Sequence, residues 1–385
     1  MKIKELHIES FRGISKMDFD SFDDNVNLFL GENGAGKSSI LDAINILLSW
    51  LTAKALNVKG KGRSINGEDV KMGSASCEIA IELDDKTSWK LTKSTKESKS
   101  DLSALNEFVA KYFTEDGSRL PVIVYYDVNR YVSDIQTENG ISFKDFFAWF
   151  RNQEDIENEQ RIENSQYRDY KLEAVRNAML QIFPGYSGLK VRRNPLSLLI
   201  NKGTETLNLN QLSDGEKCYI TLVCDLARRL ADANPDGNPL EGNGIVLIDE
   251  VDLHLHPKWQ LEVVSKLKNT FRNCQFFMTS HSPLVVSDSD GKTFKIEQGV
   301  LESDGYFKPY GQSSERILPE MFDVYASRSP KIQDKINGVY AQIKSNQFED
   351  AQKNIDSLSR IIDRDDKEII ALKLELNRQK KHRQQ

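Results

Sequence analysis

GENGAGKS, residues 31–38, matches the phosphate-binding pattern G-x-x-x-x-G-K-[ST] at every defined position. We expect it to connect a strand over residues 26–30 to a helix that starts near Ser38. The glycines allow successive backbone N–H groups to curl around a phosphate, and Lys37 can neutralise the charge of the β and γ groups. Ser38 can offer its hydroxyl group to Mg²⁺. This stretch therefore predicts a nucleotide-binding loop.

A second stretch, IVLIDE at residues 245–250, predicts where the metal ion and the attacking water lie. An unbroken apolar run is typical of a parallel strand that is buried on both faces and carries a site at its carboxyl end. Asp249 would orient the Mg²⁺ shell, and Glu250 would polarise a water molecule. Taken alone, the pattern also fits an ordinary strand followed by a polar turn.

A third stretch, LSDGEK at residues 212–217, precedes a largely apolar run that predicts a helix over residues 218–230. Ser213 and Gly215 then lie at a helix N-terminus, where a hydroxyl group, exposed N–H groups and the helix dipole favour an anion. An ordinary helix N-cap is the alternative interpretation. Its place one helix before residues 245–250 resembles the signature loop of ABC and SMC-like ATPases, in the form found in the SMC-like and RecF-like branch.

Two shorter motifs appear in the order of the same superfamily. FRGI, residues 11–14, resembles the element whose arginine, Arg12 here, would lie against the bound nucleotide. SHSP, residues 280–283, follows an apolar strand that we expect over residues 275–279. His281 matches the switch histidine that reaches the γ-phosphate in that superfamily.

The stretch VDLHLHP, residues 251–257, resembles the D-loop, with Asp252 at the position that contacts an opposite subunit. His254 and His256 lie two residues apart beside a carboxylate, but no Cys or third His follows at ligand spacing, so we expect them to shape the turn rather than bind zinc. These six motifs together predict an α/β fold. They resemble an ABC/SMC-type P-loop ATPase head, with a parallel core sheet and an antiparallel β-subdomain, to which a helical insertion and a C-terminal helical hairpin are added.

The composition favours a soluble cytoplasmic protein. The 385 residues carry a net charge of −6, which gives no global attraction to nucleic acid, although lysines and Arg63 cluster at residues 54–63 and lysines at 93–99. We interpret these clusters as solvated loops more readily than as a binding surface. No apolar stretch approaches membrane-spanning length, and no signal peptide is evident. The four cysteines show no CxxC or disulfide-like spacing, so we expect buried thiols.

Residues 77–92 alternate in polarity around a turn at 84–86, which predicts a hairpin. Residues 151–183 are charged and helical in pattern, but they lack sustained heptads, so a compact lid is expected instead of a long coiled coil. Gln153 is a candidate for the superfamily's Q-loop glutamine, although an exposed residue on a polar helix is the simpler reading. We expect four parts, namely an N-terminal ATPase lobe at 1–130, a helical insertion at 131–195, a C-terminal ATPase lobe at 196–310 and a helical region at 311–385.

The last part of the chain predicts helices. A short helix should end near Tyr325, and amphipathic patterns predict helices over residues 332–343, 348–362 and 367–381. This region resembles a helical hairpin that docks a partner, and a plain stabilising tail is the alternative.

The whole chain resembles the PtuA family, the ATPases of Septu anti-phage systems and of related retron-linked modules. The features that carry this resemblance, on a compact ABC-type head, are a helical C-terminal hairpin and four stretches: LSDGEK, EVDLHLHP at residues 250–257, SHSP, and YGQSSERIL at residues 310–318. The resemblance implies an ATPase that uses ATP and Mg²⁺ and assembles as head-to-tail dimers or higher homo-oligomers around ATP. It also implies a separate HNH nuclease partner, with phage DNA as the eventual target and no membrane association.

The resemblance assigns roles to individual residues. Catalysis falls to Glu250 and His281, and metal binding to Ser38 and Asp249. The residues assigned to nucleotide contacts are Arg12, Asn33, Gly34, Ala35, Gly36, Lys37, Ser38, Ser39, Ser213, Gly215 and Asp252. The main alternative is a RecF-like repair ATPase that binds DNA directly, whereas Asp214 and the charged insertion argue against a transporter subunit.

Overall fold

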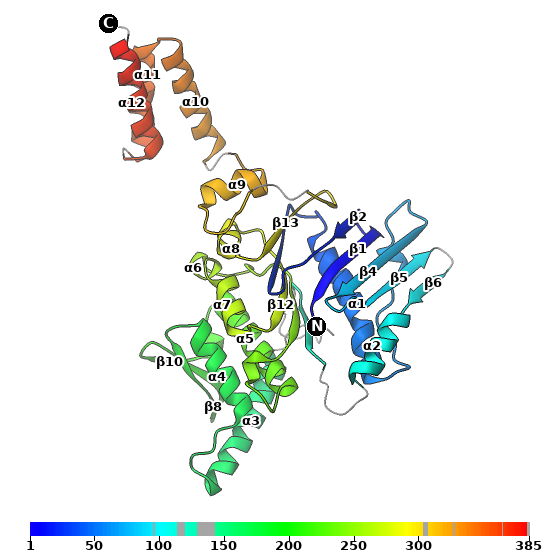
Figure 1. Cartoon of the computed structure of the whole chain (residues 1–385). Coiled ribbons are helices and arrows are strands. Elements are labelled where there is room, and N and C mark those ends of the chain that lie inside the picture. The colour runs from blue at the N-terminus through cyan, green and yellow to red at the C-terminus, as the bar shows by residue number, and fades with distance from the viewer. Residues whose placement is uncertain are drawn as a thin grey trace. The chain divides into compact units, whose positions relative to one another are not determined.

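Six strands form the central sheet of the protein, in the order β14-β13-β3-β12-β11-β7, in a computed structural model (Figure 1). Neighbouring strands are parallel, apart from the short β14. Every residue of β3, β11 and β12 is buried, as the apolar runs predicted. The strands are β3 (Val26–Leu30), β7 (Val122–Tyr126), β11 (Gly244–Ile248), β12 (Cys274–Thr279), β13 (Lys292–Glu297) and β14 (Val300–Leu301).

The structure describes residues 1–94, 97–113, 120–128, 143–302, 307–325, 328–363 and 365–382. Two units make up the chain, Met1–Ile317 and Leu318–Gln385, and each is described by itself. The four-part division expected from the sequence stays a prediction.

A second, antiparallel sheet has the order β2-β1-β4-β5-β6. The hairpin expected over residues 77–92 is confirmed, because β4 pairs with β5 around Asp84–Lys86. Between the sheets, phenylalanine rings of both layers meet edge to face, as Phe19 of β2 and Phe294 of β13 do at 5.2 Å between centroids. The strands are β1 (Ile3–Phe11), β2 (Ile14–Phe19), β4 (Ser76–Leu83), β5 (Ser88–Ser94) and β6 (Ser98–Asp101).

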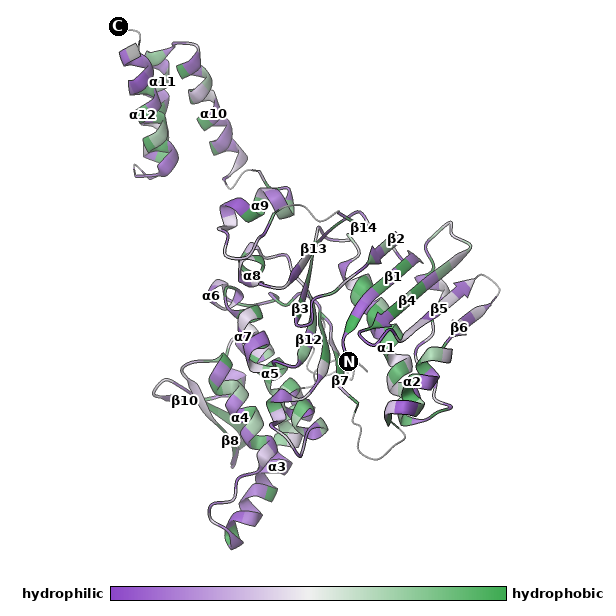
Figure 2. Ribbon diagram, viewed as in Figure 1, coloured by the Kyte–Doolittle hydropathy of each residue, from purple (hydrophilic) through white to green (hydrophobic). Residues whose placement is uncertain are grey.

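Helix α1 (Lys37–Leu56) lies against strands of both sheets. By length and composition it is apolar enough to cross a membrane, so the expectation that no stretch approaches such a length was wrong for this helix. Eleven of its 20 residues are buried, and Figure 2 shows it as a largely hydrophobic element beside the sheets. Its apolar character is therefore accounted for by packing in the core.

The insertion after β7 contains helices α3 (Phe143–Glu163) and α4 (Tyr170–Ile182), as the charged pattern predicted. Asp169 caps α4 by accepting hydrogen bonds from two N–H groups of its first turn. A three-stranded antiparallel sheet then follows, which the sequence did not predict and whose first strand falls inside the stretch expected to be helical. Its strands are β8 (Tyr186–Arg193), β9 (Leu196–Lys202) and β10 (Glu205–Asn208).

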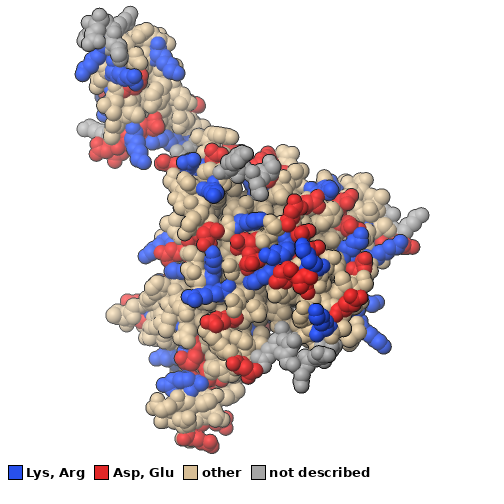
Figure 3. All heavy atoms as spheres, in the orientation of Figure 1, with Lys and Arg blue, Asp and Glu red and all other residues tan. Residues whose placement is uncertain are grey.

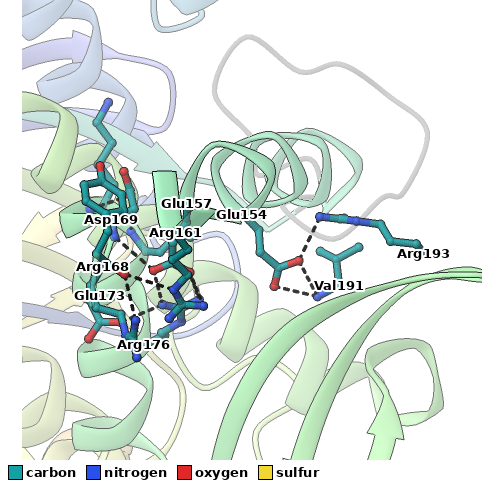
Figure 4. Close-up of polar contacts among 12 residues, drawn as sticks. Glu154, Glu157, Arg161, Arg168, Asp169, Glu173, Arg176, Val191 and Arg193 are labelled. Atoms are coloured by element: carbon teal, nitrogen blue, oxygen red, sulfur yellow. Dashed lines mark hydrogen bonds and ion pairs between the residues drawn. The ribbon is translucent and has the colours of Figure 1, made fainter. Parts of the chain in front are cut away.

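Buried carboxylates hold this insertion together (Figure 4). Glu157 of α3 is fully buried and receives two hydrogen bonds of 3.0 Å from Arg176 of α4. Glu154, one turn earlier, accepts from the backbone N–H of Val191 and from Arg193 in β8. Because an unpaired buried carboxylate is costly, these pairs fix α3 against both neighbours. The long helix is therefore polar in sequence and yet well packed.

The remaining helices of the first unit surround the sheets, and α5 is the helix expected after LSDGEK. They are α2 (Ser103–Phe113), α5 (Asp214–Ala233), α6 (Pro257–Gln260), α7 (Val263–Thr270), α8 (Pro283–Asp288) and α9 (Ser314–Phe322), the last of which crosses into the second unit. Helix α9 ends before the expected Tyr325, at Asp323, whose left-handed φ of 56° stops the helix.

The second unit contains the three amphipathic helices that the sequence predicted, α10 (Pro330–Lys344), α11 (Phe348–Ile361) and α12 (Lys367–His382). They share a core of nine buried apolar side chains, among them Ile336, Ile355 and Leu372. Arg328 also pairs with Asp366 before α12. This unit therefore has its own hydrophobic core.

Candidate nucleotide-binding site

The loop 31–38 connects the carboxyl end of β3 to the first turn of α1, as expected. Gly36 caps the helix with a φ of +105°, a conformation that glycine adopts at little cost, and a side chain there would press on Ile14. Asn33, Gly34 and Ser38 are exposed, Ala35 is buried and Ser39 is half-buried. The N-terminus of α1 thus presents its backbone N–H groups at the end of the sheet, the arrangement that favours a phosphate.

Lys37 lies inside this loop with 6% of its surface exposed. Its ammonium group donates hydrogen bonds of 2.9 Å to the carbonyl oxygens of Gly31 and Glu32. Burial lowers the pKa of Lys37, and the charges of nearby carboxylates, foremost Asp249, oppose that shift. The lysine is therefore held in the loop, close to the acidic end of β11.

Thr279, the last residue of β12, holds both carboxylate residues that follow β11. Its hydroxyl donates to Asp249 at 2.5 Å and accepts the backbone N–H of Glu250 at 2.7 Å. Asp249 is 3% exposed, and Thr279 is fully buried. Glu250 has a left-handed φ of 47°, a costly conformation that turns the chain sharply beyond the strand. Two neighbouring strand ends therefore position the acidic pair.

His281 follows the same strand end. Its backbone N–H lies 3.4 Å from the carboxylate of Asp252, which accepts the hydrogen bond. Burial lowers the pKa of His281, as does the positive charge of Lys37, while the surrounding carboxylates oppose the shift. At neutral pH His281 is therefore neutral and can both donate and accept hydrogen bonds.

The residues expected to bind Mg²⁺ fit that ion. Magnesium prefers oxygen ligands and is usually held by one or two carboxylates together with phosphates and waters. Asp249 supplies a nearly buried carboxylate beside Lys37, and Ser38 supplies an exposed hydroxyl at the start of α1. Across the described ranges, no three Asp, Glu, His or Cys side chains form a metal-binding group, so a metal here would depend on ligands that the nucleotide brings.

Ser213 is exposed and caps α5 in a reciprocal arrangement with Glu216. The serine hydroxyl donates to the carboxylate of Glu216 at 2.9 Å and accepts the N–H of Glu216 at 3.3 Å. This is a capping box, the local structure that the LSDGEK pattern encodes. The signature serine is therefore preformed at a helix N-terminus, and its hydroxyl already has an acceptor.

The other oxygen of Glu216 links α5 to the insertion. It accepts hydrogen bonds from the hydroxyl of Tyr186 at 2.5 Å and from Lys202 at 2.6 Å. Burial alone would raise the pKa of Glu216, but the bonds from Lys202, Tyr186 and Ser213 outweigh it and lower the pKa to about 2. Glu216 is therefore ionised at neutral pH, and Lys202 balances its charge.

Gly215 is buried against the turn that follows β11. A side chain at this position would approach the carbonyl oxygen of His254 to 2.0 Å, so only glycine fits. His254 has a left-handed φ of 61°, and the ring of His256 accepts the N–H of Lys258 to cap α6. Both histidines therefore shape the turn, as the sequence predicted, and Gly215 lets the signature helix approach it.

Arg12 lies between β1 and β2, where it pairs with Asp42 of α1 and with Asp69, the latter at 2.9 Å. Burial lowers the pKa of Arg12, but the two carboxylates outweigh burial and raise it. The guanidinium group is thus fixed against the second turn of α1.

The structure brings five of the predicted residues together at the end of the central sheet, whereas Ser213 and Gln153 are not part of this group. The charges of Lys37, Asp249, Glu250, Asp252 and His281 act on one another at the carboxyl ends of β3, β11 and β12. In the part of the chain that the structure describes, Ser213 makes no hydrogen bond to the loop 31–38; its partner is Glu216. Gln153 lies half-buried on α3, as a residue of a polar helix.

Sequence reasoning missed Thr279, Lys202 and Tyr186. The signal for Thr279 was a lone hydroxyl at the end of an apolar strand, directly before the SHSP motif. Lys202 and Tyr186 gave no signal, since both reach Glu216 from strands of a sheet that the sequence did not predict.

Comparison with known proteins identifies the family. Residues 26–287 match the family model described as "AAA domain, putative AbiEii toxin, Type IV TA system". The chain is 30% identical to the Retron Ec83 probable ATPase of Escherichia coli, over 98% of this chain and 87% of that protein. It is 29% identical to the Retron Vc95 probable ATPase of Vibrio cholerae serotype O1 biovar El Tor, over 83% and 79%.

A third relative is the Septu protein PtuA of Bacillus thuringiensis, 27% identical over 85% of this chain and 86% of that protein. Among solved structures, an SMC head bound to the C-terminal winged-helix domain of ScpA superposes with a TM-score of 0.51 at 18% identity, covering 78% of this chain and 96% of that one. This likeness confirms the expected ABC-type head fold. The chain therefore belongs to this AAA domain family, among homologues named as retron ATPases and as the Septu protein PtuA.

Proposed function

We propose that this protein is the ATPase subunit of a cytoplasmic anti-phage defence complex. It binds ATP with Mg²⁺ at the loop 31–38, assembles around ATP and controls a partner nuclease. The observation that carries the proposal is the shared electrostatic neighbourhood of Lys37, Asp249, Glu250 and His281 at the ends of three adjacent parallel strands. Such strand ends are where nucleotide chemistry occurs in α/β sheets.

In this proposal the loop residues Asn33 to Ser39 and Lys37 hold the phosphates, while Ser38 and Asp249 would hold Mg²⁺. When bound, the metal ion would neutralise charge on the phosphates and polarise the γ-phosphate. Glu250 orients and polarises the attacking water, and neutral His281 donates a hydrogen bond toward the γ-phosphate. The buried hydroxyl of Thr279 keeps the Asp249 carboxylate and the backbone of Glu250 in place.

Assembly around ATP would bring the exposed Ser213 of one subunit to the γ-phosphate bound by its neighbour. Gly215 and Asp252 would complete that contact, and Arg12 would line the nucleotide from its own subunit. Because the Ser213 hydroxyl donates to Glu216, it must exchange that acceptor for a phosphate oxygen when the interface closes. Lys202 keeps the released carboxylate balanced while this happens.

The nuclease partner follows from the resemblance to the PtuA family, in which an HNH nuclease accompanies the ATPase. The names of the homologues, retron ATPases and Septu protein PtuA, support a role in such systems. We assign partner docking to the helical region 311–385 and the lid to 131–195, with the ATPase lobes at 1–130 and 196–310.

The test is the mass of the protein in solution and its cleavage of plasmid DNA, alone and co-expressed with the nuclease, with and without ATP and Mg²⁺. Lys37→Ala should abolish ATP-dependent assembly, because the loop loses its cation. Glu250→Gln should trap the assembled form, because hydrolysis stops while ATP still binds. Unchanged assembly in both variants would contradict the model in which ATP holds the subunits together.

A stable complex with ATP-sensitive cleavage would support the defence function. No complex and no cleavage, together with ATP-dependent DNA binding by the protein alone, would instead favour a RecF-like repair ATPase.

A further inference from the structure

The segment 59–63, Lys-Gly-Lys-Gly-Arg, leaves the end of α1 and folds back along it. A side chain at Gly60 would lie 2.1 Å from the carbonyl oxygen of Ala53, and one at Gly62 would lie 2.5 Å from the backbone nitrogen of Trp50. Both glycines therefore face the helix at a distance that no other residue permits. The three cations between and beside them, Lys59, Lys61 and Arg63, are exposed.

Two hydrogen bonds fasten this segment to α1. The indole N–H of Trp50 donates to the carbonyl oxygen of Arg63 at 2.8 Å, and the N–H of Arg63 donates to the hydroxyl of Ser49 at 2.8 Å. Among the residues that the structure describes, none forms an ion pair with Lys59, Lys61 or Arg63. The backbone is thus anchored while three positive charges remain directed to solvent.

A second group of cations lies beside the first. A cavity of about 240 Å³ separates the segment from β5 and β6, and its lining includes Lys61, Lys93 and Lys99 with the hydroxyl groups of Ser64 and Ser98. The two lysine clusters that are 30 residues apart in the sequence therefore border one hollow. We call residues 59–63 with Lys93 and Lys99 the basic ridge, in which Lys93 donates to the hydroxyl of Ser98 and Lys99 pairs with Glu97 at 3.2 Å.

The segment at the centre of the ridge is rich in positive charge, unlike the chain as a whole. Residues 54–66 contain four basic residues and no acidic one, in a chain whose net charge is −6. On the face drawn in Figure 3, by contrast, positive and negative side chains are interspersed. A concentration of one sign against an acidic background raises the local potential for a polyanion.

We propose that the basic ridge binds the phosphate backbone of double-stranded DNA. Gly60 and Gly62 both face α1, and the three exposed cations alternate with them, so Lys59, Lys61 and Arg63 are spaced along the segment instead of converging on one anion. A row of cations suits the regularly charged backbone of a duplex. Serine hydroxyl groups beside the lysines are further phosphate ligands.

The lining favours a duplex over a single strand. Single-strand binding surfaces stack bases on exposed aromatic rings. The aromatic residue that lines this hollow, Trp50, is only 8% exposed, and its N–H group is bound to Arg63. The ridge therefore contacts the backbone without reading bases, and we expect no sequence preference.

The ridge lies far from the nucleotide site. Helix α1 starts at Lys37 in the loop, and the segment packs against Ser49 and Trp50, which lie about 20 Å further along the helix. The inference therefore does not depend on the proposed ATPase, and the two can fail separately.

The experiment measures binding of the full-length protein to a fluorescent 40-base-pair DNA duplex by anisotropy over a series of salt concentrations. The variant is Lys59→Gln, Lys61→Gln and Arg63→Gln combined. The matched control replaces three other exposed cations that lie outside the ridge, Lys16, Arg272 and Lys308, by glutamine, which removes the same charge. Thermal unfolding and ATP binding, measured for both, show that each is folded.

We expect the ridge variant to bind the duplex at least tenfold more weakly at 0.1 M salt. The slope of log affinity against log salt concentration should be less negative by about 2.7, since each lost phosphate contact reduces its magnitude by about 0.9. The control should match the parent protein. Equal weakening in both variants, an unchanged slope, or tighter binding to single-stranded DNA or to anionic lipid vesicles than to the duplex would each overturn the proposal.

Discussion

At the scale of the residue, Thr279 holds the Asp249 carboxylate and the backbone of Glu250 after β11. Its hydroxyl is bonded to both Asp249 and the N–H of Glu250, at 2.5 and 2.7 Å, in a fully buried position. Thr279→Val keeps the shape of the side chain but removes these bonds. We expect a loss of about 1–3 kcal/mol in unfolding free energy, because buried polar groups lose their partner.

The same change should lower kcat for ATP hydrolysis by roughly ten- to a hundredfold, because Glu250 is no longer held in its strained conformation. Steady-state ATPase assays and thermal unfolding measure the two effects. Thr279→Ser, which keeps the hydroxyl group, is the control and should retain most of the activity. A Thr279→Val protein with normal kcat would rule out this positioning role.

At the scale of the element, two lysines attach the ends of α5 to the insertion and to the sheet that follows it. Lys202 of β9 pairs with Glu216 in the first turn at 2.6 Å, and Lys171 of α4 pairs with Asp232 in the last turn at 2.5 Å. The Lys202 pair lies beside Ser213, whereas the Lys171 pair lies at the far end of the helix. Only the Lys202 pair can therefore influence Ser213 directly. Comparing changes in the two pairs distinguishes an effect on Ser213 from an effect of attachment to α5 alone.

We expect Lys202→Met to weaken ATP-dependent assembly about fivefold, roughly 1 kcal/mol, because the Glu216 carboxylate then repels the arriving phosphate. Lys171→Met should leave assembly unchanged. Sedimentation of each variant with ATP, combined with Glu250→Gln to prevent hydrolysis, gives the dissociation constants. Equal effects of the two changes would mean that the insertion only stabilises α5.

At the scale of the whole molecule, the unit Leu318–Gln385 has a core of its own, in which Ile355 is fully buried. Ile355→Ala should lower the unfolding free energy of this unit by about 2–5 kcal/mol, through lost burial and the cavity it leaves. Calorimetry should show the transition of this unit shifted, with that of Met1–Ile317 unmoved. A matched shift in both transitions would show that the units unfold together.

The sequence alone determined the parts of this protein that are encoded locally. The motifs, the buried strands and the amphipathic helices each depend on residues a few positions apart, and the motifs taken together in their order predicted an ABC-type head. The capping box of Ser213 and Glu216 is of the same kind.

Only the tertiary structure decided which distant residues meet. It placed Thr279 under the acidic pair, joined Lys202 to Glu216 through an unpredicted sheet, and brought the lysines near residues 61 and 93 to one hollow. It also showed that the apolar helix α1 is buried between two sheets. The physical reason is that hydrophobic periodicity reports which face of an element is buried, whereas contacts between elements depend on how strands pair and helices pack, and these leave no local pattern in the chain.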